Sequence, residues 1–316
     1  MAYIVQRQER IPQKRRQVRA TTAYRYAWFV ERCIIPAIGD IPLRRLRADH
    51  LDDLYESLAL SRGRDGDGLA PKTIQEVHMI VRAALDLAVE RELVVRNVAH
   101  GARARRRPPT RAAARVWNAA ELRTFLHAAR SQRLYPALHL AACTGMRRGE
   151  VAGLKWSDLD TSGERLSISR TLQNVGGTPV EFGVKTRASR RTVELDRATV
   201  NELRRWRQRL HRDGLPHGRD DWMFCNASGR FPDPESIGQL FDRVVRRSGL
   251  PRIRFHDLRH THASLLIADG APIKVVSERL GHAHPAYTMH TYQHLWPGMS
   301  ARAAEQFASL IGTSHR

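Results

Sequence analysis

Apolar residues recur at helical spacing in the first third of the chain. In TTAYRYAWFVERCIIPAI, residues 21–38, they follow a threonine that suits a helix N-terminus, and the pattern ends at a proline and a glycine. The same spacing returns over residues 46–60 and in PKTIQEVHMIVRAALDLAVERELVV, residues 71–95, which has a proline in its first turn. These patterns predict a small helical domain over residues 21–104.

The rest of the chain combines further helical patterns with one short stretch of β character. Helical spacing covers residues 119–129, 135–142, 197–210, 233–249, 254–270, 272–281 and 301–311. Between them, RLSISRT (residues 165–171), VEFGVKT (180–186) and RRTVEL (190–195) predict three short antiparallel strands. We therefore expect a mainly α fold, whose larger domain over residues 116–316 contains a small three-stranded antiparallel sheet and ends in a tail helix.

A basic segment interrupted by prolines separates the two helical regions. GARARRRPPTRAAAR, residues 101–115, has two adjacent prolines and no acidic residue, so a continuous helix cannot pass through it. Its arginines are Arg103, Arg105, Arg106, Arg107, Arg111 and Arg115. We predict that residues 105–115 form a linker that follows a DNA phosphate backbone, the alternative being a merely solvated linker. Residues 1–20 form a second basic segment.

The charge balance narrows the class of binding partner. The chain has 53 Lys and Arg against 32 Asp and Glu, a formal net charge of +21, while 42% of its 316 residues are hydrophobic. This composition is typical of a folded protein that attracts polyanions, and nucleic acid leads over anionic membranes and acidic proteins. The sequence has no long apolar span, secretory signal or lipidation motif, so we expect no membrane partner and a cytoplasmic protein associated with the nucleoid.

The histidines do not form a recognisable metal motif, and the three cysteines lie too far apart in the sequence to suggest one. In RFHDLRHTHASLLIADG, residues 254–270, helical spacing puts only His256 and His260 on a common face, with no acid or cysteine to complete a coordination sphere. His262 falls near the apolar face, and we expect it to be a packed, hydrogen-bonded core residue. No metal and no other cofactor is predicted.

Residues suited to phosphate chemistry gather where predicted helices begin. In ACTGMRRGEVAGLKWSDL, Gly145 separates two helices, so Arg147 lies at a helix N-terminus, a place that favours an anion. Glu150 lies on the same helical face and can hold the Arg147 guanidinium. His256 and Arg259 are three residues apart and therefore project together from one face of another helix.

A third such place is ERLGHAHPAYTMHTYQHLW, where Gly281 ends a helix before His282 and Tyr292 follows ten residues later. Taken in chain order, TGMR with its glutamate, the lysine of VKTRASRRT, HDLR, LGH and a tyrosine resemble the tyrosine recombinases, the phage integrase family. The helical N-terminal region and its IPAIGDIPLRRL also resemble the core-binding (SAM-like) domain of phage-type integrases. The resemblance implies a DNA clamp of two domains joined by a linker.

The resemblance also assigns roles to the matching residues. The catalytic set becomes Arg147, Lys185, His256, Arg259, His282 and Tyr292, with Glu150 as the supporting acid. In the family pattern the two arginines bind the cleaved phosphate, His256 accepts a proton, His282 hydrogen-bonds the phosphate, Lys185 protonates the departing 5′ oxygen and Tyr292 is the nucleophile. Two alternatives stay open: Tyr287 competes with Tyr292, and Arg187 lies on the same strand face as Lys185.

The activity implied is that of a site-specific recombinase or integrase of a phage or mobile element, which cuts and rejoins DNA through a 3′-phosphotyrosyl intermediate without ATP. The implied partners are specific attachment sites in double-stranded DNA, a homo-tetramer on synapsed DNA, and a directionality factor or a host DNA-bending protein. The alternatives are a cleavage-deficient DNA-binding remnant, an enzyme that relaxes DNA like a type IB topoisomerase, and a metal-dependent hydrolase. The tail helix either packs on its own domain or docks on a neighbouring protomer.

Overall fold

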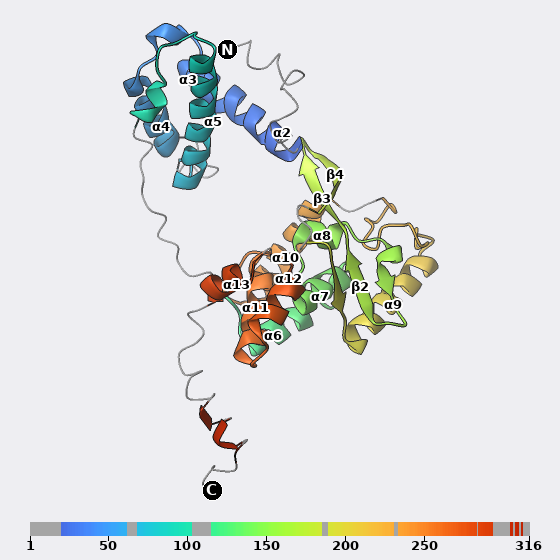
Figure 1. Cartoon of the computed structure of the whole chain (residues 1–316). Coiled ribbons are helices and arrows are strands. Elements are labelled where there is room, and N and C mark those ends of the chain that lie inside the picture. The colour runs from blue at the N-terminus through green and yellow to red at the C-terminus, as the bar shows by residue number, and fades with distance from the viewer. Residues whose placement is uncertain are drawn as a thin grey trace. The chain divides into compact units, whose positions relative to one another are not determined.

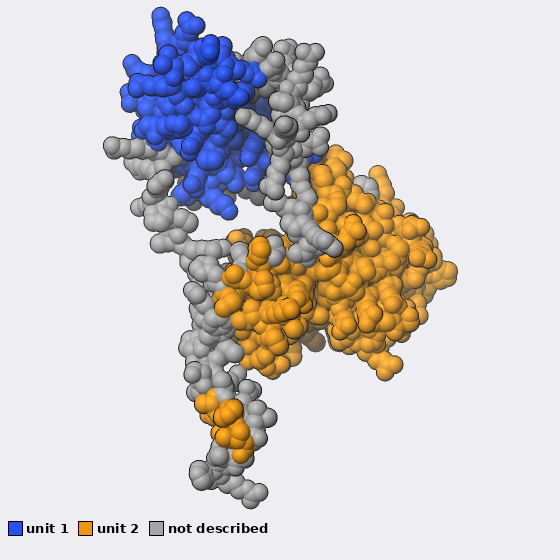
Figure 2. All heavy atoms as spheres, viewed as in Figure 1, with its two compact units in different colours: residues 1–112 blue, residues 113–316 orange. Residues whose placement is uncertain are grey.

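The computed structural model describes residues 20–61, 68–102, 115–184, 189–230, 233–282, 284–292, 304–305, 307–309 and 311. The chain divides into two compact units, Met1–Ala112 and Ala113–Arg316 (Figure 2). No helix in these described ranges is both long enough and apolar enough to span a membrane.

The first unit is helical throughout its described elements (Figure 1). It contains α2 (Ala20–Phe29), a π turn (Val30–Ile34), α3 (Ile35–Ile38), a 3-10 turn (Leu43–Arg45), α4 (Ala48–Ser61), α5 (Pro71–Glu90) and a 3-10 turn (Val98–His100). The apolar positions that carried the helical pattern, such as Phe29, Leu51 and Val77, are buried in one core. The three predicted helices are confirmed, although α5 ends before residue 95 because Glu92 adopts a φ of 58°, which a right-handed helix does not allow.

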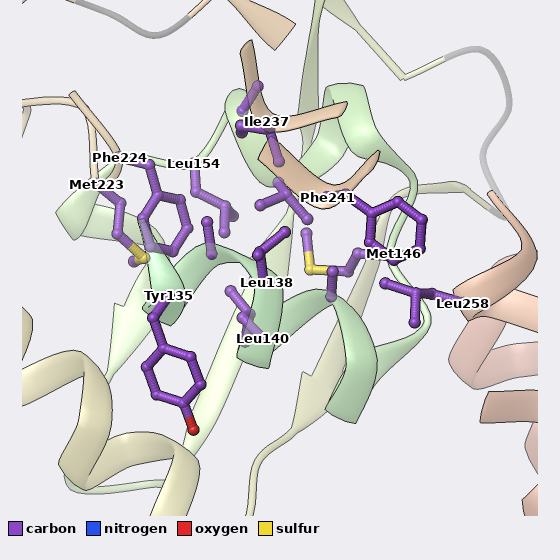
Figure 3. Packing of buried hydrophobic residues seen from close by; sticks show 14 of the residues in the cluster. Tyr135, Leu138, Leu140, Met146, Leu154, Met223, Phe224, Ile237, Phe241 and Leu258 are labelled. Atoms are coloured by element: carbon purple, nitrogen blue, oxygen red, sulfur yellow. The ribbon is translucent and has the colours of Figure 1, made fainter. Parts of the chain in front are cut away.

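The second unit packs helices around a larger core. Its helices are α6 (Ala119–Ala129), α7 (Tyr135–Thr144), α8 (Arg148–Ala152), α9 (Arg197–Arg212), α10 (Pro234–Ser248), α11 (Asp257–Ala268), α12 (Ile273–Leu280) and α13 (Pro285–Tyr292), with a 3-10 turn at Trp156–Asp158. Figure 3 shows part of the core, with Leu138, Met146 and Phe241 among the buried side chains. Because the Met146 side chain is buried, it fixes the position of the backbone from which Arg147 extends.

Within the described residues, the β structure forms two separate antiparallel sheets. A three-stranded sheet has the order β1 (Leu159–Asp160), β2 (Arg165–Ile168) and β5 (Arg191–Glu194), and a two-stranded hairpin joins β3 (Arg170–Val175) to β4 (Thr178–Gly183). Gly176 and Gly177 both have positive φ, 60° and 87°, so they form a two-residue turn that folds β4 back onto β3.

The predicted fold class, a mainly α protein with a small three-stranded antiparallel sheet, is confirmed, but the membership of the sheet differs from the prediction. The segment 165–171 is divided between β2 and β3, and the segment 180–186 contributes β4, which pairs with β3 outside the three-stranded sheet. The very short strand β1 takes the third place, opposite β2. A two-residue strand has too little pattern to be recognised in a sequence.

One helix was not predicted, and several predicted features fall outside the described residues. Helix α13 has a weak amphipathic pattern and packs against α12, so tertiary contacts rather than spacing define it. Of the linker arginines, Arg115 is exposed, and Arg103, Arg105, Arg106, Arg107 and Arg111 lie outside the described residues. Of the predicted tail helix, residues 304–305 and 307–309 are described and are helical.

Candidate active site

A left-handed glycine lies two residues before Arg147, at a point where two other segments of the unit approach the chain. Helix α7 ends at Gly145, whose φ is 64°, and a Cβ atom there would come within 2.7 Å of Leu280 and 3.0 Å of His262. Only glycine tolerates both that conformation and that approach. The chain then leads through buried Met146 to Arg147, which immediately precedes α8, so the predicted place at a helix N-terminus is confirmed. The Arg147 side chain is 38% exposed.

The Glu150 carboxylate is the anchor of this segment. It is 3% exposed and accepts two hydrogen bonds from Arg147, one from the backbone N–H at 2.9 Å and one from Nη1 at 2.7 Å. It also accepts two from Arg191, from Nη1 at 3.2 Å and from Nη2 at 3.0 Å. Each carboxylate oxygen therefore accepts one hydrogen bond from Arg147 and one from Arg191. The contact expected between Glu150 and the Arg147 guanidinium is present.

Arg191 was not among the residues predicted from the sequence. In the structure its side chain is only 6% exposed. It lies on β5 two residues before Val193, and alternate residues of a strand share a face. An arginine in register with a buried valine was the signal that could have identified it. Burial alone would raise the pKa of Glu150, but the hydrogen bonds and charge of Arg191, together with Arg147, outweigh burial and hold that pKa below its ordinary value of 4.5.

Replacing Glu150 by glutamine is expected to lower the free energy of unfolding by about 3 kcal/mol at pH 7, because two arginines then lose a buried counter-charge. Folding lowers the pKa of Glu150, so its stabilising contribution is fully present above the ordinary pKa of 4.5 and is lost as the pH falls through the lower pKa of the folded state. In urea titrations, the gap between wild type and Glu150→Gln should therefore narrow toward acidic pH.

The matched control is Glu194→Gln, since the Glu194 side chain is 79% exposed and forms a surface ion pair with Arg165 at 3.8 Å. Loss of that surface pair should cost less than about 1 kcal/mol. Equal effects of the two substitutions at pH 7 would contradict the anchoring role of Glu150.

Arg259 connects α11 to the turn that precedes Arg147. It is 3% exposed, and its Nη1 donates a 3.0 Å hydrogen bond to the backbone carbonyl of Gly145. This hydrogen bond joins the segment that carries Arg147 to the buried guanidinium group of Arg259 on α11. A buried arginine with fixed hydrogen bonds is a preorganised cation, which is the property an anion site requires.

His256 immediately precedes α11, and its ring lies on the same side as that of His260. The two ring centroids are 5.4 Å apart and nearly perpendicular, which confirms the common face expected from their spacing. His256 is exposed at the surface. Partial desolvation of its ring, then the charges of His260 and Arg259, lower its pKa to about 4, against a smaller opposite effect of Asp257. The imidazole is therefore neutral at pH 7 and able to accept a proton.

His282 follows Gly281, the left-handed residue that ends α12, and its Nδ1 lies 2.7 Å from Thr288 Oγ1. Burial first, and then the charges of Arg259 and Arg147, lower the pKa of His282 to about 3. Gly145 lies against Leu280 and His262, and Arg259 donates to its carbonyl. The backbone segments that carry Arg147, Arg259 and His282 therefore meet at this glycine.

The structure does not describe the side chains of the predicted nucleophile and the predicted lysine, or those of their competitors. Tyr292 is the last residue of α13 and Tyr287 lies in the same helix, but only their backbone positions are described. Lys185 and its competitor Arg187 fall outside the described residues. His262, in contrast, is buried and hydrogen-bonded, as expected: its Nδ1 lies 3.1 Å from the carbonyl of Ala142.

This site combines two guanidinium groups, Arg147 and Arg259, with two imidazoles that are neutral at pH 7, His256 and His282. Within the described part of the chain, no group of three or more His, Cys, Asp or Glu residues is arranged to hold a metal ion. The arrangement can neutralise a phosphate through two guanidinium groups, and it can accept or donate protons through His256 and His282.

Comparison with known proteins identifies the family of the chain. Residues 115–297 match the phage integrase family, which is more than half of the chain, and the chain therefore belongs to that family, the tyrosine recombinases. It is 28% identical over 254 residues to the ICEBs1 integrase of Bacillus subtilis (strain 168), covering 77% of this chain and 67% of the relative. It is 30% identical over 207 residues to a XerC-like tyrosine recombinase of Caldanaerobacter subterraneus subsp. tengcongensis, covering 60% and 53%.

Solved structures show the same fold. The Tn1549 transposon integrase in complex with transposon right end DNA superposes with a TM-score of 0.73 at 20% identity, covering 98% of both chains. A lambda integrase dimer bound to a COC′ core site superposes with a TM-score of 0.64 at 18% identity, covering 88% of this chain and 90% of that chain. The chain spans about two thirds of the length of the ICEBs1 integrase and about half of the length of the XerC-like recombinase.

Proposed function

We propose that the chain is a site-specific DNA recombinase that cuts and rejoins DNA through a 3′-phosphotyrosyl intermediate, in the integration or excision of a mobile element. The observation that carries the proposal is the link between its two arginines. Arg259 is buried and donates to the Gly145 carbonyl, and Arg147, two residues further on, is held by Glu150. The relatives named as integrases and recombinases, and the DNA complexes of the Tn1549 and lambda enzymes, support DNA as the substrate.

The two arginines would stabilise the charge that develops on the nonbridging oxygens of the cleaved phosphate. Guanidinium groups stay protonated at all physiological pH values and bind phosphate oxygens in a bidentate manner, so no metal is needed for this step. Their positions are fixed before DNA binds, by Glu150 in one case and by the Gly145 carbonyl in the other. Preorganised donors of this kind are worth more than mobile ones because they need not rearrange during the reaction.

The two histidines would handle the protons at the attacking side. A tyrosine has an ordinary pKa of about 10, so Tyr292 needs a neighbouring base, and neutral His256 is the candidate. We assign Thr288 as the donor to His282 Nδ1, 2.7 Å away, which places the ring proton on Nε2. In the proposal, that Nε2–H donates to the phosphate.

The covalent step is a balanced transesterification. The Tyr292 oxygen bonds to phosphorus while the bond from phosphorus to the 5′ oxygen breaks, and the 5′ oxygen takes a proton from Lys185. The phosphoester energy is kept in the phosphotyrosyl bond, so a 5′ hydroxyl of another strand can reverse the step without ATP. Each proton lost by tyrosine to His256 is returned when the strands are rejoined.

The remaining parts of the proposal concern DNA binding and assembly. Residues 21–104 would act as the core-binding domain, residues 105–115 would follow the phosphate backbone, and residues 116–316 would carry catalysis. Four protomers would act on two synapsed attachment sites, with a directionality factor or a DNA-bending protein as the accessory partner. The chain would work on chromosomal DNA in the nucleoid.

The experiment uses a DNA duplex that the protein itself selects from a randomised pool. A nick placed near the point of cleavage releases a short strand and traps the covalent intermediate. We expect a protein–DNA adduct that resists denaturation and forms equally well with and without EDTA. Binding without any adduct would indicate a cleavage-deficient remnant, loss of cleavage in EDTA a metal-dependent hydrolase, and relaxation of any supercoiled plasmid a topoisomerase-like enzyme.

A further inference from the structure

Arg279, near the end of α12, has no role in the mechanism above, yet its side chain connects the segments that supply that mechanism. We propose that Arg279, acting with His262, is a positioning residue for strand cleavage: it fixes the spacing between Arg147, Arg259 and His282 without touching DNA. This inference rests on the proposed recombinase function.

Three nitrogen atoms of the Arg279 guanidinium donate to three different segments. Nε donates to His262 Nε2 at 3.2 Å on α11, Nη1 to the backbone carbonyl of Glu194 at 3.0 Å on β5, and Nη2 to the carbonyl of Cys143 at 3.1 Å on α7. These acceptors are separated by 51 residues or more along the sequence, so only the fold brings them together.

Each of these segments leads directly to a residue of the site. Cys143 lies four residues before Arg147, Glu194 lies on the same strand as Arg191, and His262 lies one turn after Arg259. Arg279 itself lies three residues before His282. A shift of its side chain would therefore change the distances between all of these groups.

Arg191 closes the network from the other direction. Its Nε donates a 2.7 Å hydrogen bond to the backbone carbonyl of Arg279, while its Nη atoms hold Glu150. Arg279 thus accepts a hydrogen bond from Arg191 on β5 and donates one to Glu194 on the same strand. A closed set of bonds between rigid elements holds relative positions better than a single contact does.

His262 is suited to this network only as a neutral ring. Its Nδ1 donates to the Ala142 carbonyl at 3.1 Å, which leaves Nε2 as the acceptor for Arg279. Burial, and then the charge of Arg279, lower the pKa of His262 to about 4, so the neutral form holds at pH 7. The acceptor that Arg279 needs is therefore present under the conditions of the reaction.

Lysine cannot replace Arg279 in this role. Its single ammonium group is a point charge on a flexible stem, whereas the planar guanidinium donates in several fixed directions at once. Arg279→Lys keeps the charge, and therefore the long-range attraction to DNA, but it cannot serve the three acceptors together. The Arg279→Lys variant therefore distinguishes a loss of positioning from a loss of DNA affinity.

The test compares DNA affinity with the rate of covalent-complex formation, using the full chain and the nicked duplex described above. Because a misplacement of about 1 Å can cost about 100-fold in rate, Arg279→Lys should cleave about 100-fold more slowly while its Kd for the duplex stays close to that of wild type. The control is Arg204→Lys on α9, where an exposed arginine also donates to a backbone carbonyl, that of Thr161 at 3.0 Å, and where no change in cleavage is expected.

A second pair of variants covers the case in which Arg279→Lys is too unstable to assay. His262→Gln keeps an acceptor for Arg279 and His262→Leu removes it, so the glutamine variant should cleave faster than the leucine variant at equal DNA affinity. Wild-type cleavage by Arg279→Lys, a loss of cleavage that only mirrors a loss of affinity, or equal rates of the two His262 variants would overturn the inference. Absence of any adduct with the wild-type protein would instead contradict the proposed function.

Discussion

Replacement of Tyr292 by phenylalanine is expected to abolish the covalent protein–DNA complex while leaving DNA binding intact. Phenylalanine keeps the ring but lacks the hydroxyl oxygen that forms the bond to phosphorus, so no other step can compensate. The measurement is a denaturing gel with a labelled nicked duplex, which resolves the adduct from unreacted DNA, beside a native gel that reports binding.

Tyr287→Phe provides the matched control, because Tyr287 lies on the same helix, five residues before Tyr292. That variant should form the adduct as wild type does. An adduct with Tyr292→Phe and none with Tyr287→Phe would assign the nucleophile to Tyr287 and reject the spacing on which Tyr292 was chosen.

Replacement of Arg259 by lysine is expected to slow cleavage by about 100-fold or more, the usual cost of losing a preorganised donor to a developing charge. Lysine retains the positive charge but loses the fork that can bind phosphate and the Gly145 carbonyl at the same time. Single-turnover rates of adduct formation at saturating protein measure this effect separately from DNA affinity.

Arg254→Lys is the control for that experiment. Arg254 lies five residues before Arg259, its side chain is exposed, and it pairs with Asp257 at 2.9 Å. A lysine can keep this surface ion pair, so the rate should stay close to that of wild type. Similar decreases in the rate of adduct formation for Arg254→Lys and Arg259→Lys would contradict a specific role of buried Arg259 in cleavage.

The parts of the fold that could be predicted from the sequence are those with a local cause. The long helices of the first unit, such as α4 and α5, follow from apolar spacing over three or more turns, and the place of Arg147 follows from Gly145. The common face of His256 and His260 and the burial of His262 follow from helical geometry. In each case a few neighbouring residues contain the whole cause.

The parts that could not be predicted depend on contacts between distant segments. Strand alternation could have marked Arg191 as buried, but its partner lies 41 residues away in the sequence. Arg279 is one of 53 basic residues, and its three acceptors are two backbone carbonyls and the ring of His262. The place of β4 depended on a glycine pair that selects a tight hairpin rather than a longer connection. Hydrogen bonds to backbone carbonyls leave no trace in the identity of the residue that accepts them.

The central claim is that the chain joins itself to the 3′ phosphate of DNA through Tyr292, and mass spectrometry of the trapped complex tests it most directly. Nuclease and trypsin treatment should leave a nucleotide remnant on the peptide of residues 280–302, which contains both Tyr287 and Tyr292. Fragmentation of that peptide should place the remnant, joined through a 3′ phosphate, on Tyr292. A remnant on any other residue, a linkage through a 5′ phosphate, or cleaved DNA with no attached peptide would contradict the account.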